Sequence, residues 1–167
     1  MSLILCSTPR VDRLAELYVN DLQDPATRAV LDADDAVVLT ASPEFMAKPW
    51  LLKYLRVPND NVYGAKIGVR NDRRSTPRFT GSISGELPIG QAKVELLRQC
   101  PPCLAPGARL TGYGDHPTDV PFLEECSRGV LVYQPGHDLP MEQRGGCILE
   151  EAMPFEGPLE PTPKLPS

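Results

Sequence analysis

The chain begins with segments whose apolar residues recur at helical spacing. An amphipathic helix is predicted over about residues 9–22 from the spacing of Val11, Leu14, Leu17, Tyr18 and Leu22. Asp24-Pro25 has the form of an N-cap followed by proline at the first helical position, which predicts a second short helix. Together these segments predict a helical, cap-like region over about residues 9–34.

A strand followed by a helix is predicted next. The apolar, partly β-branched run Ala36–Leu39 is typical of a strand that is buried on both faces. Ser42 can cap a helix and Pro43 can start it, so we expect a helix over 44–55. Thr40 then places a hydroxyl at the carboxyl end of the strand.

The remaining pattern alternates between strands and helices. The predicted elements are a strand at 62–68, a hairpin arm at 78–83, a helix at 91–99, a strand at 108–113, a short helix at 117–126 and a strand at 130–133. This alternation predicts an α/β fold with helices packed around a mainly parallel sheet. Proline, glycine and acidic residues dominate after Tyr133, so we expect a packed domain over 1–134 and an irregular tail over 135–167.

Length and charge narrow the possible classes. The 167 residues fit one domain, and the net charge of −5 argues against nucleic acid as a partner. Residues 44–98 carry ten Lys/Arg against five Asp/Glu, a surplus that suits a phosphorylated ligand or an anionic membrane, although a solvated basic face is the simpler interpretation. Since no apolar run approaches the ~20 residues of a membrane span, we expect the chain as given to be soluble and not secreted.

The five cysteines do not indicate a disulfide framework. Cys100 and Cys103 form a Cys-x-x-Cys pair, but the pair ends a predicted helix, whereas a thioredoxin-like site lies where a strand leads into a helix. Zinc would need two further ligands at a recognised spacing, and none is present. Neither a redox nor a zinc function is favoured.

Four residues could together carry chemistry. Ligands bind at the carboxyl ends of strands in open α/β sheets, where we expect Thr40, Asp115 and Asp119, with Lys93 on a nearby helix. Carboxylates suit Mg²⁺, and a lysine and a hydroxyl suit a phosphoryl group. Taken singly, each residue has a simpler interpretation as a cap, a strand end or a solvated lysine. Their conjunction in this order favours a magnesium-dependent phosphoryl site.

The four residues resemble a known family. Thr40, Lys93 and Gly114-Asp115-x-x-x-Asp119 are similar to the second, third and fourth motifs of the haloacid-dehalogenase-like (HAD-like) superfamily, which implies a three-layer Rossmann-like fold. More narrowly, 37–46, 118–126 and 155–163 resemble the amino-terminal module of land-plant sn-2 glycerol-3-phosphate acyltransferases of cutin and suberin synthesis. That resemblance implies lysophosphatidic acid as substrate and the endoplasmic reticulum membrane as location.

The resemblance is incomplete in two respects. The family's opening motif, Asp-x-Asp-x-Thr with its aspartate nucleophile, is absent from the sequence, which is why we expect a fold truncated at its N-terminus. Asp32-Ala33-Asp34 matches the Asp-x-Asp part of this motif, but it precedes a predicted strand and ends a predicted helix. We therefore reject it as the opening motif. The acyltransferase motif is absent too. We therefore expect negligible phosphatase activity and weak or no Mg²⁺ binding.

Three functions stay open. The first is an inactive portion of a bifunctional acyltransferase/phosphatase; the second is a pseudoenzyme that binds phosphorylated ligands or a protein partner; the third is a truncated hydrolase of the phosphoserine-phosphatase type. The apolar run Leu3–Cys6 also allows a structural hypothesis, namely that it occupies the central strand position and brings 6–8 near Thr40. A frayed terminus is the simpler alternative.

Overall fold

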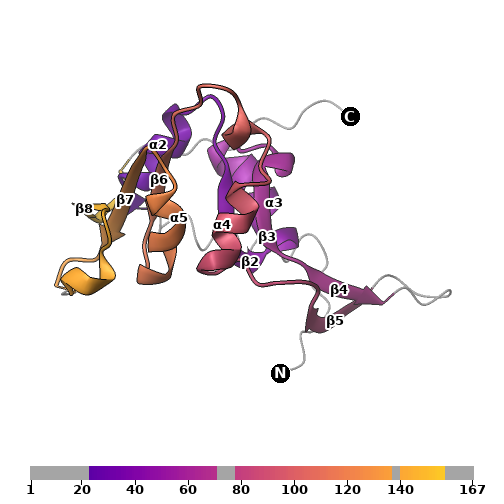
Figure 1. Ribbon diagram of the computed structural model, residues 1–167. Coiled ribbons are helices and arrows are strands. Elements are labelled where there is room, and N and C mark those ends of the chain that lie inside the picture. The colour runs from indigo at the N-terminus through magenta and orange to yellow at the C-terminus, as the bar shows by residue number, and fades with distance from the viewer. Residues whose placement is uncertain (1–22, 71–77, 137–139, 157–167) are drawn as a thin grey trace.

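The computed structural model describes residues 23–70, 78–136 and 140–156. Figure 1 shows two groups of strands, β2 with β3 and β6 with β7 and β8, and helices pack against both groups. Strand pairing within each group is parallel, while the pairs β4–β5 and β1–β9 are antiparallel. The α/β architecture with a mainly parallel sheet is therefore confirmed.

The first group is a strand–helix–strand unit. β2 (Val38–Pro43) leads into α3 (Glu44–Leu55), and the chain returns through the 3-10 turn Asn59–Asn61 to β3 (Val62–Ala65). The apolar face of α3 packs on β3, and partly buried residues of β2 and of α2 (Ala26–Asp32) cover the same core. The side chain of Asn61 donates to the carbonyl of Ala36 at 3.1 Å, which ties the return loop to the start of β2.

A hairpin extends from this unit. β4 (Ile67–Arg70) pairs with β5 (Arg78–Ile83), and in Figure 1 the hairpin projects away from the helices. Phe79 stacks on Phe45 of α3 with ring centroids 4.2 Å apart, which holds β5 against the start of α3 near the loop end of the hairpin.

The second group is a three-stranded parallel sheet of β6 (Thr111–Gly114), β7 (Arg128–Tyr133) and β8 (Ile148–Glu151). α4 (Gln91–Leu97) and α5 (Val120–Glu124) cover one face, where Val94 and Leu123 pack on Leu131. Val130 and Val132 point to the opposite face and are buried there. After β8, β9 (Met153–Pro154) pairs with β1 (Gln23–Asp24), which brings the start of the described chain beside its end.

Several local predictions need correction. Residues 148–154 form strands, so the expectation of an irregular tail from residue 135 is wrong there, because β8 pairs with the central strand β7. Asp24 does not cap α2; its carboxylate accepts from Arg28 at 2.8 Å, and Pro25 occupies the cap position. α3 has the predicted bounds, but neither Ser42 nor Pro43 caps it through a side chain.

The buried strands are also shorter or more exposed than predicted. β2 starts two residues late, continues to Pro43 and is only partly buried, and β6 starts at Thr111 because 108–109 are exposed. The predicted strand at 62–68 is broken into β3 and β4, and the predicted helix at 117–126 divides into a 3-10 turn (Pro117–Asp119) and α5. The helix expected at 9–22 and the strand expected at 3–6 lie outside the described residues. No helix in the described part of the chain is long and apolar enough to cross a membrane.

Candidate phosphoryl site at the carboxyl ends of β2 and β6

All four residues singled out in the sequence line one cavity of about 650 Å³, which we call the carboxyl-edge pocket. Thr40 lies on β2, Lys93 on α4, Asp115 directly after β6, and Asp119 at the start of α5. β2 and β6 belong to different strand groups, yet both lead into this pocket. The structure thus brings the four together, while the ligand that they bind stays a prediction.

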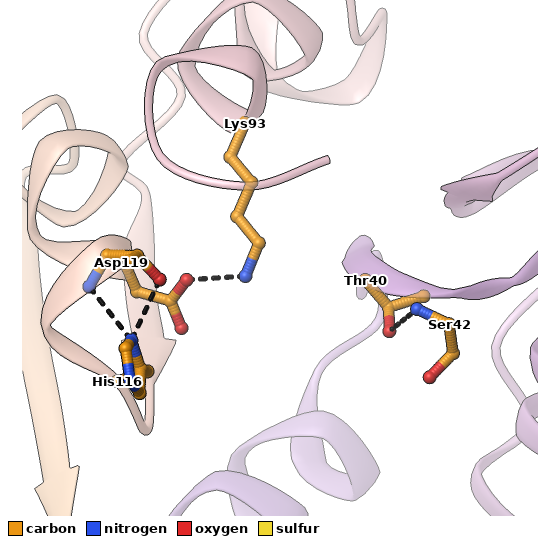
Figure 2. Close-up of polar contacts among 6 residues, drawn as sticks. Thr40, Ser42, Lys93, His116 and Asp119 are labelled. Carbon is orange, nitrogen blue, oxygen red and sulfur yellow. Dashed lines mark hydrogen bonds and ion pairs between the residues drawn. The ribbon is translucent and has the colours of Figure 1, made fainter. Parts of the chain in front are cut away.

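An ion pair joins the two helices at the pocket wall. The ammonium of Lys93 donates to Oδ1 of Asp119 at 2.5 Å, with side-chain exposures of 12% and 6% (Figure 2). The same ammonium lies 5.3 Å from the ring centroid of Phe122, within the range of a cation–π contact. At such low exposure each charge is stabilised by the other, and removal of either one would leave an uncompensated buried charge. Lys93 is therefore held in place and is not a solvated surface lysine.

A glycine allows Asp119 to reach this position. A Cβ at residue 114 would lie 2.6 Å from the Cβ of Asp119 and 2.9 Å from its Oδ2. β6 and the start of α5 approach one another so closely that only glycine fits between them. The Gly-Asp-x-x-x-Asp spacing thus has a packing reason: its glycine gives the second aspartate room to turn toward Lys93.

Thr40 forms the opposite side of the pocket. Its Oγ1 accepts from the backbone N–H of Ser42 at 3.1 Å, and Figure 2 shows both residues across from Lys93. The hydroxyl is the acceptor in this bond and does not use its own proton, so that proton can be donated to a ligand oxygen. The ammonium and the hydroxyl thus offer donors from two different elements.

Asp115 and His116 form the rim. Asp115 is exposed and, within the described residues, forms no hydrogen bond or ion pair, so its carboxylate is available to solvent and ligands. Nδ1 of His116 accepts from the backbone N–H of Thr118 at 3.2 Å and caps the 3-10 turn that follows. This cap was not predicted from the sequence; the available signal was a histidine directly before the proline that starts the turn.

The described residues do not fit a magnesium site as they stand. No group of three or more His, Cys, Asp or Glu that could hold a metal occurs among residues 23–70, 78–136 and 140–156. Asp115 is free, but one oxygen of Asp119 is committed to Lys93. Metal binding by Asp115 and Asp119 stays a prediction.

Three cysteines, Cys103, Cys126 and Cys147, lie in environments that disfavour their thiolates. Burial, and then a hydrogen bond with Cys100, raises the pKa of Cys103 to about 12. Burial likewise raises the pKa of Cys126 and of Cys147. Reactive cysteines need the opposite shift. These thiols offer no support for a redox function.

Fold and pocket together define a class. The chain is an α/β protein of the Rossmann-like type with its polar pocket at the carboxyl ends of parallel strands, where such folds bind ligands. The model of the haloacid dehalogenase-like hydrolase family matches residues 6–124, well over half of the sequence. The chain therefore belongs to the haloacid dehalogenase-like hydrolase family. No curated protein matches the sequence, and nothing in these comparisons supports the narrower relationship to plant acyltransferases.

Proposed function

We propose that the carboxyl-edge pocket binds the phosphoryl group of a phosphorylated small molecule, as part of a phosphatase-type module. The observation that carries the proposal is the placement of the Lys93 ammonium on one wall and the Thr40 hydroxyl on the other. Two fixed donors on opposite walls suit the several oxygens of a phosphoryl group. Membership of the hydrolase family supports the same chemistry.

The charge balance of the pocket predicts how phosphate binds. One lysine and two aspartates line it, so the acidic charges exceed the basic ones by one when His116 is neutral. A phosphate dianion therefore meets a donor pair and also an uncompensated carboxylate, Asp115. We expect weak binding of phosphate alone, because like charges in a cleft repel.

The narrower proposal concerns the ligand. Lysophosphatidic acid is the candidate taken from the resemblance to the plant acyltransferase module, in which the phosphatase would yield monoacylglycerol. A pseudoenzyme that binds phosphorylated ligands or a protein partner is the second candidate. Two observations favour this second candidate over hydrolysis: the given sequence contains no Asp-x-Asp-x-Thr motif to supply the attacking carboxylate, and Asp119 is paired with Lys93.

Titration tests the binding proposal. Inorganic phosphate and lysophosphatidic acid are titrated into the purified chain, with and without Mg²⁺, and amide chemical shifts near the pocket are followed by NMR. Thr40→Val, which keeps the shape and removes the hydroxyl, should weaken binding. Thr80→Val, an exposed threonine on β5, is the matched control. Absence of saturable shifts with either ligand, with or without Mg²⁺, rejects the proposal.

Asp115→Asn then separates two roles of the carboxylate. If Asp115 only repels phosphate, the variant should bind phosphate about three- to tenfold more tightly without Mg²⁺, which is roughly 1 kcal/mol of removed repulsion. If Asp115 holds a metal that contacts phosphate, the variant should instead lose Mg²⁺-dependent binding. Phosphate release from lysophosphatidic acid, measured alongside, is expected at background level. Release that disappears in Asp115→Asn would overturn the inactive interpretation.

A further inference from the structure

The imidazole of His116 is held by only one of its two ring nitrogens. His116 is exposed and lines the carboxyl-edge pocket directly after Asp115. Its Nδ1 accepts from the backbone N–H of Thr118 at 3.2 Å, and the hydroxyl of Thr118 lies 3.0 Å from the same nitrogen. Within the described residues Nε2 forms no hydrogen bond or ion pair. The other end of the ring is therefore free for a ligand.

The backbone contact determines which nitrogen of the neutral ring carries the proton. A neutral imidazole has one N–H donor and one acceptor nitrogen. Because the backbone N–H of Thr118 can only donate, Nδ1 is the acceptor and the proton lies on Nε2. The Thr118 hydroxyl is compatible with this tautomer, since it can donate its own proton to Nδ1. The neutral side chain thus presents an Nε2–H donor.

The local fold also orients this donor. The hydrogen bond holds Nδ1 against the 3-10 turn Pro117–Asp119, and the ring places Nε2 on the side away from that turn. Pro117 starts the turn with a restricted backbone angle, which limits how far the imidazole can shift relative to the pocket. The donor is therefore positioned before any ligand arrives.

We infer that His116 donates from Nε2–H to the bound phosphoryl group, as a third donor beside Lys93 and Thr40. The inference rests on the proposed function, because it concerns the same pocket and the same ligand chemistry. The three donors come from three parts of the fold: β2, α4 and the loop after β6. A phosphate monoester has three terminal acceptor oxygens, so each donor can take one.

His116 differs from Lys93 in what it gives up when it binds. The ammonium of Lys93 already donates to Asp119 at 2.5 Å, so its charge is shared with that carboxylate. The Nε2–H of His116 has no competing acceptor among the described residues. It can therefore donate to a phosphate oxygen without loss of an internal hydrogen bond, and its cap on the turn stays intact.

Nitrogen NMR of the unmodified chain tests the tautomer without any ligand. In mildly alkaline buffer, where histidine side chains are ordinarily neutral, the ring of His116 should show a protonated Nε2 and an unprotonated Nδ1. The sequence contains one other histidine, His137, and His137→Gln removes its signals to complete the assignment. A ring protonated mainly at Nδ1 would overturn the inference.

Two variants separate the donor from the cap. His116→Ser keeps a side-chain oxygen that can cap the turn but removes the ring N–H. We expect it to unfold at about the same urea concentration as the unmodified chain and to bind inorganic phosphate roughly three- to tenfold more weakly. His116→Gln is a poorer cap, but its amide nitrogen can take the place of Nε2. This variant should lose stability and bind phosphate more tightly than His116→Ser.

The outcomes separate this inference from the proposed function. Saturable phosphate binding with unchanged affinity in His116→Ser would overturn the inference and leave the proposed function standing. Equal weakening in both variants would also overturn it, because affinity would then follow the packing of the imidazole and not its free N–H. No saturable binding by the unmodified chain would overturn both.

The ring signals decide even where a variant does not fold. In the unmodified chain the Nε2 signal of His116 should shift during the phosphate titration along the same saturation curve as the backbone amides of Thr40 and Lys93. An Nε2 signal that stays unchanged while those amides shift would overturn the inference.

Discussion

The buried pair of Lys93 and Asp119 makes a quantitative prediction. Lys93→Met keeps an unbranched apolar stem and removes the ammonium, which leaves the Asp119 carboxylate at 6% exposure without its cation. Removal of one partner of a buried ion pair costs about 3–5 kcal/mol. Because the pair borders a pocket of about 650 Å³ that admits water, we expect the lower end, about 3 kcal/mol. For a chain of this length that corresponds to a fall in Tm of roughly 6–12 °C.

The assay is urea unfolding of a double-mutant cycle with Lys93→Met, Asp119→Leu and the double variant. Since a fully apolar replacement leaves no isolated charge, the double variant should be more stable than either single one. Arg98→Met is the matched control: Arg98 joins Glu125 at 2.9 Å at the other ends of the same helices, with both side chains exposed. That variant should lose less than about 1 kcal/mol. A loss for Lys93→Met no larger than that of the control would refute the reasoning.

Three further outcomes follow from single contacts. Gly114→Ala should destabilise the chain by about 1–3 kcal/mol in urea unfolding, because the new Cβ overlaps Asp119; unchanged stability would show that β6 and α5 can separate. Burial alone would raise the pKa of Glu44. Hydrogen bonds from Lys48 and from the Gly64 N–H, together with the positive charges of Lys48 and Lys66, outweigh burial and lower the pKa below its ordinary value of 4.5. The stability from Glu44 is then complete above the unfolded-state pKa and lost as pH falls through the folded-state pKa; Glu44→Gln should lower stability at pH 7 and differ less from the unmodified chain in acid. With a pKa of about 12 against an ordinary 9.0, the Cys103 thiol should be alkylated at pH 8 about a thousandfold more slowly in the folded chain than in urea, as mass spectrometry can measure.

The sequence was sufficient for elements whose signals are local. α3 and β5 have the predicted bounds, and Lys93 lies near the start of its helix, because helical periodicity and turn residues act over a few neighbours. The shared location of Thr40, Lys93, Asp115 and Asp119 was also predictable, since the carboxyl ends of parallel strands meet at one edge.

Features that depend on distant partners were not predictable in the same way. β8 contains two glutamates in four residues and was missed; Glu150 accepts from Arg128 at 2.9 Å, a partner 22 residues away that compensates its charge. The Lys93–Asp119 pair joins residues 26 apart, and its formation depends on how α4 packs on α5. Sequence spacing predicts Asp119 as a metal ligand, but it could not show that Lys93 also contacts one of its oxygens.

The two donors of the carboxyl-edge pocket come from parts of the fold that share no backbone ladder. Among the described residues β2 pairs only with β3, and β6 pairs only with β7. The separation between the Thr40 hydroxyl and the Lys93 ammonium therefore depends on how α4 packs beside β2. Donors held at a fixed separation lose less entropy when a phosphoryl group binds, so the affinity of the pocket for phosphate should depend on this packing.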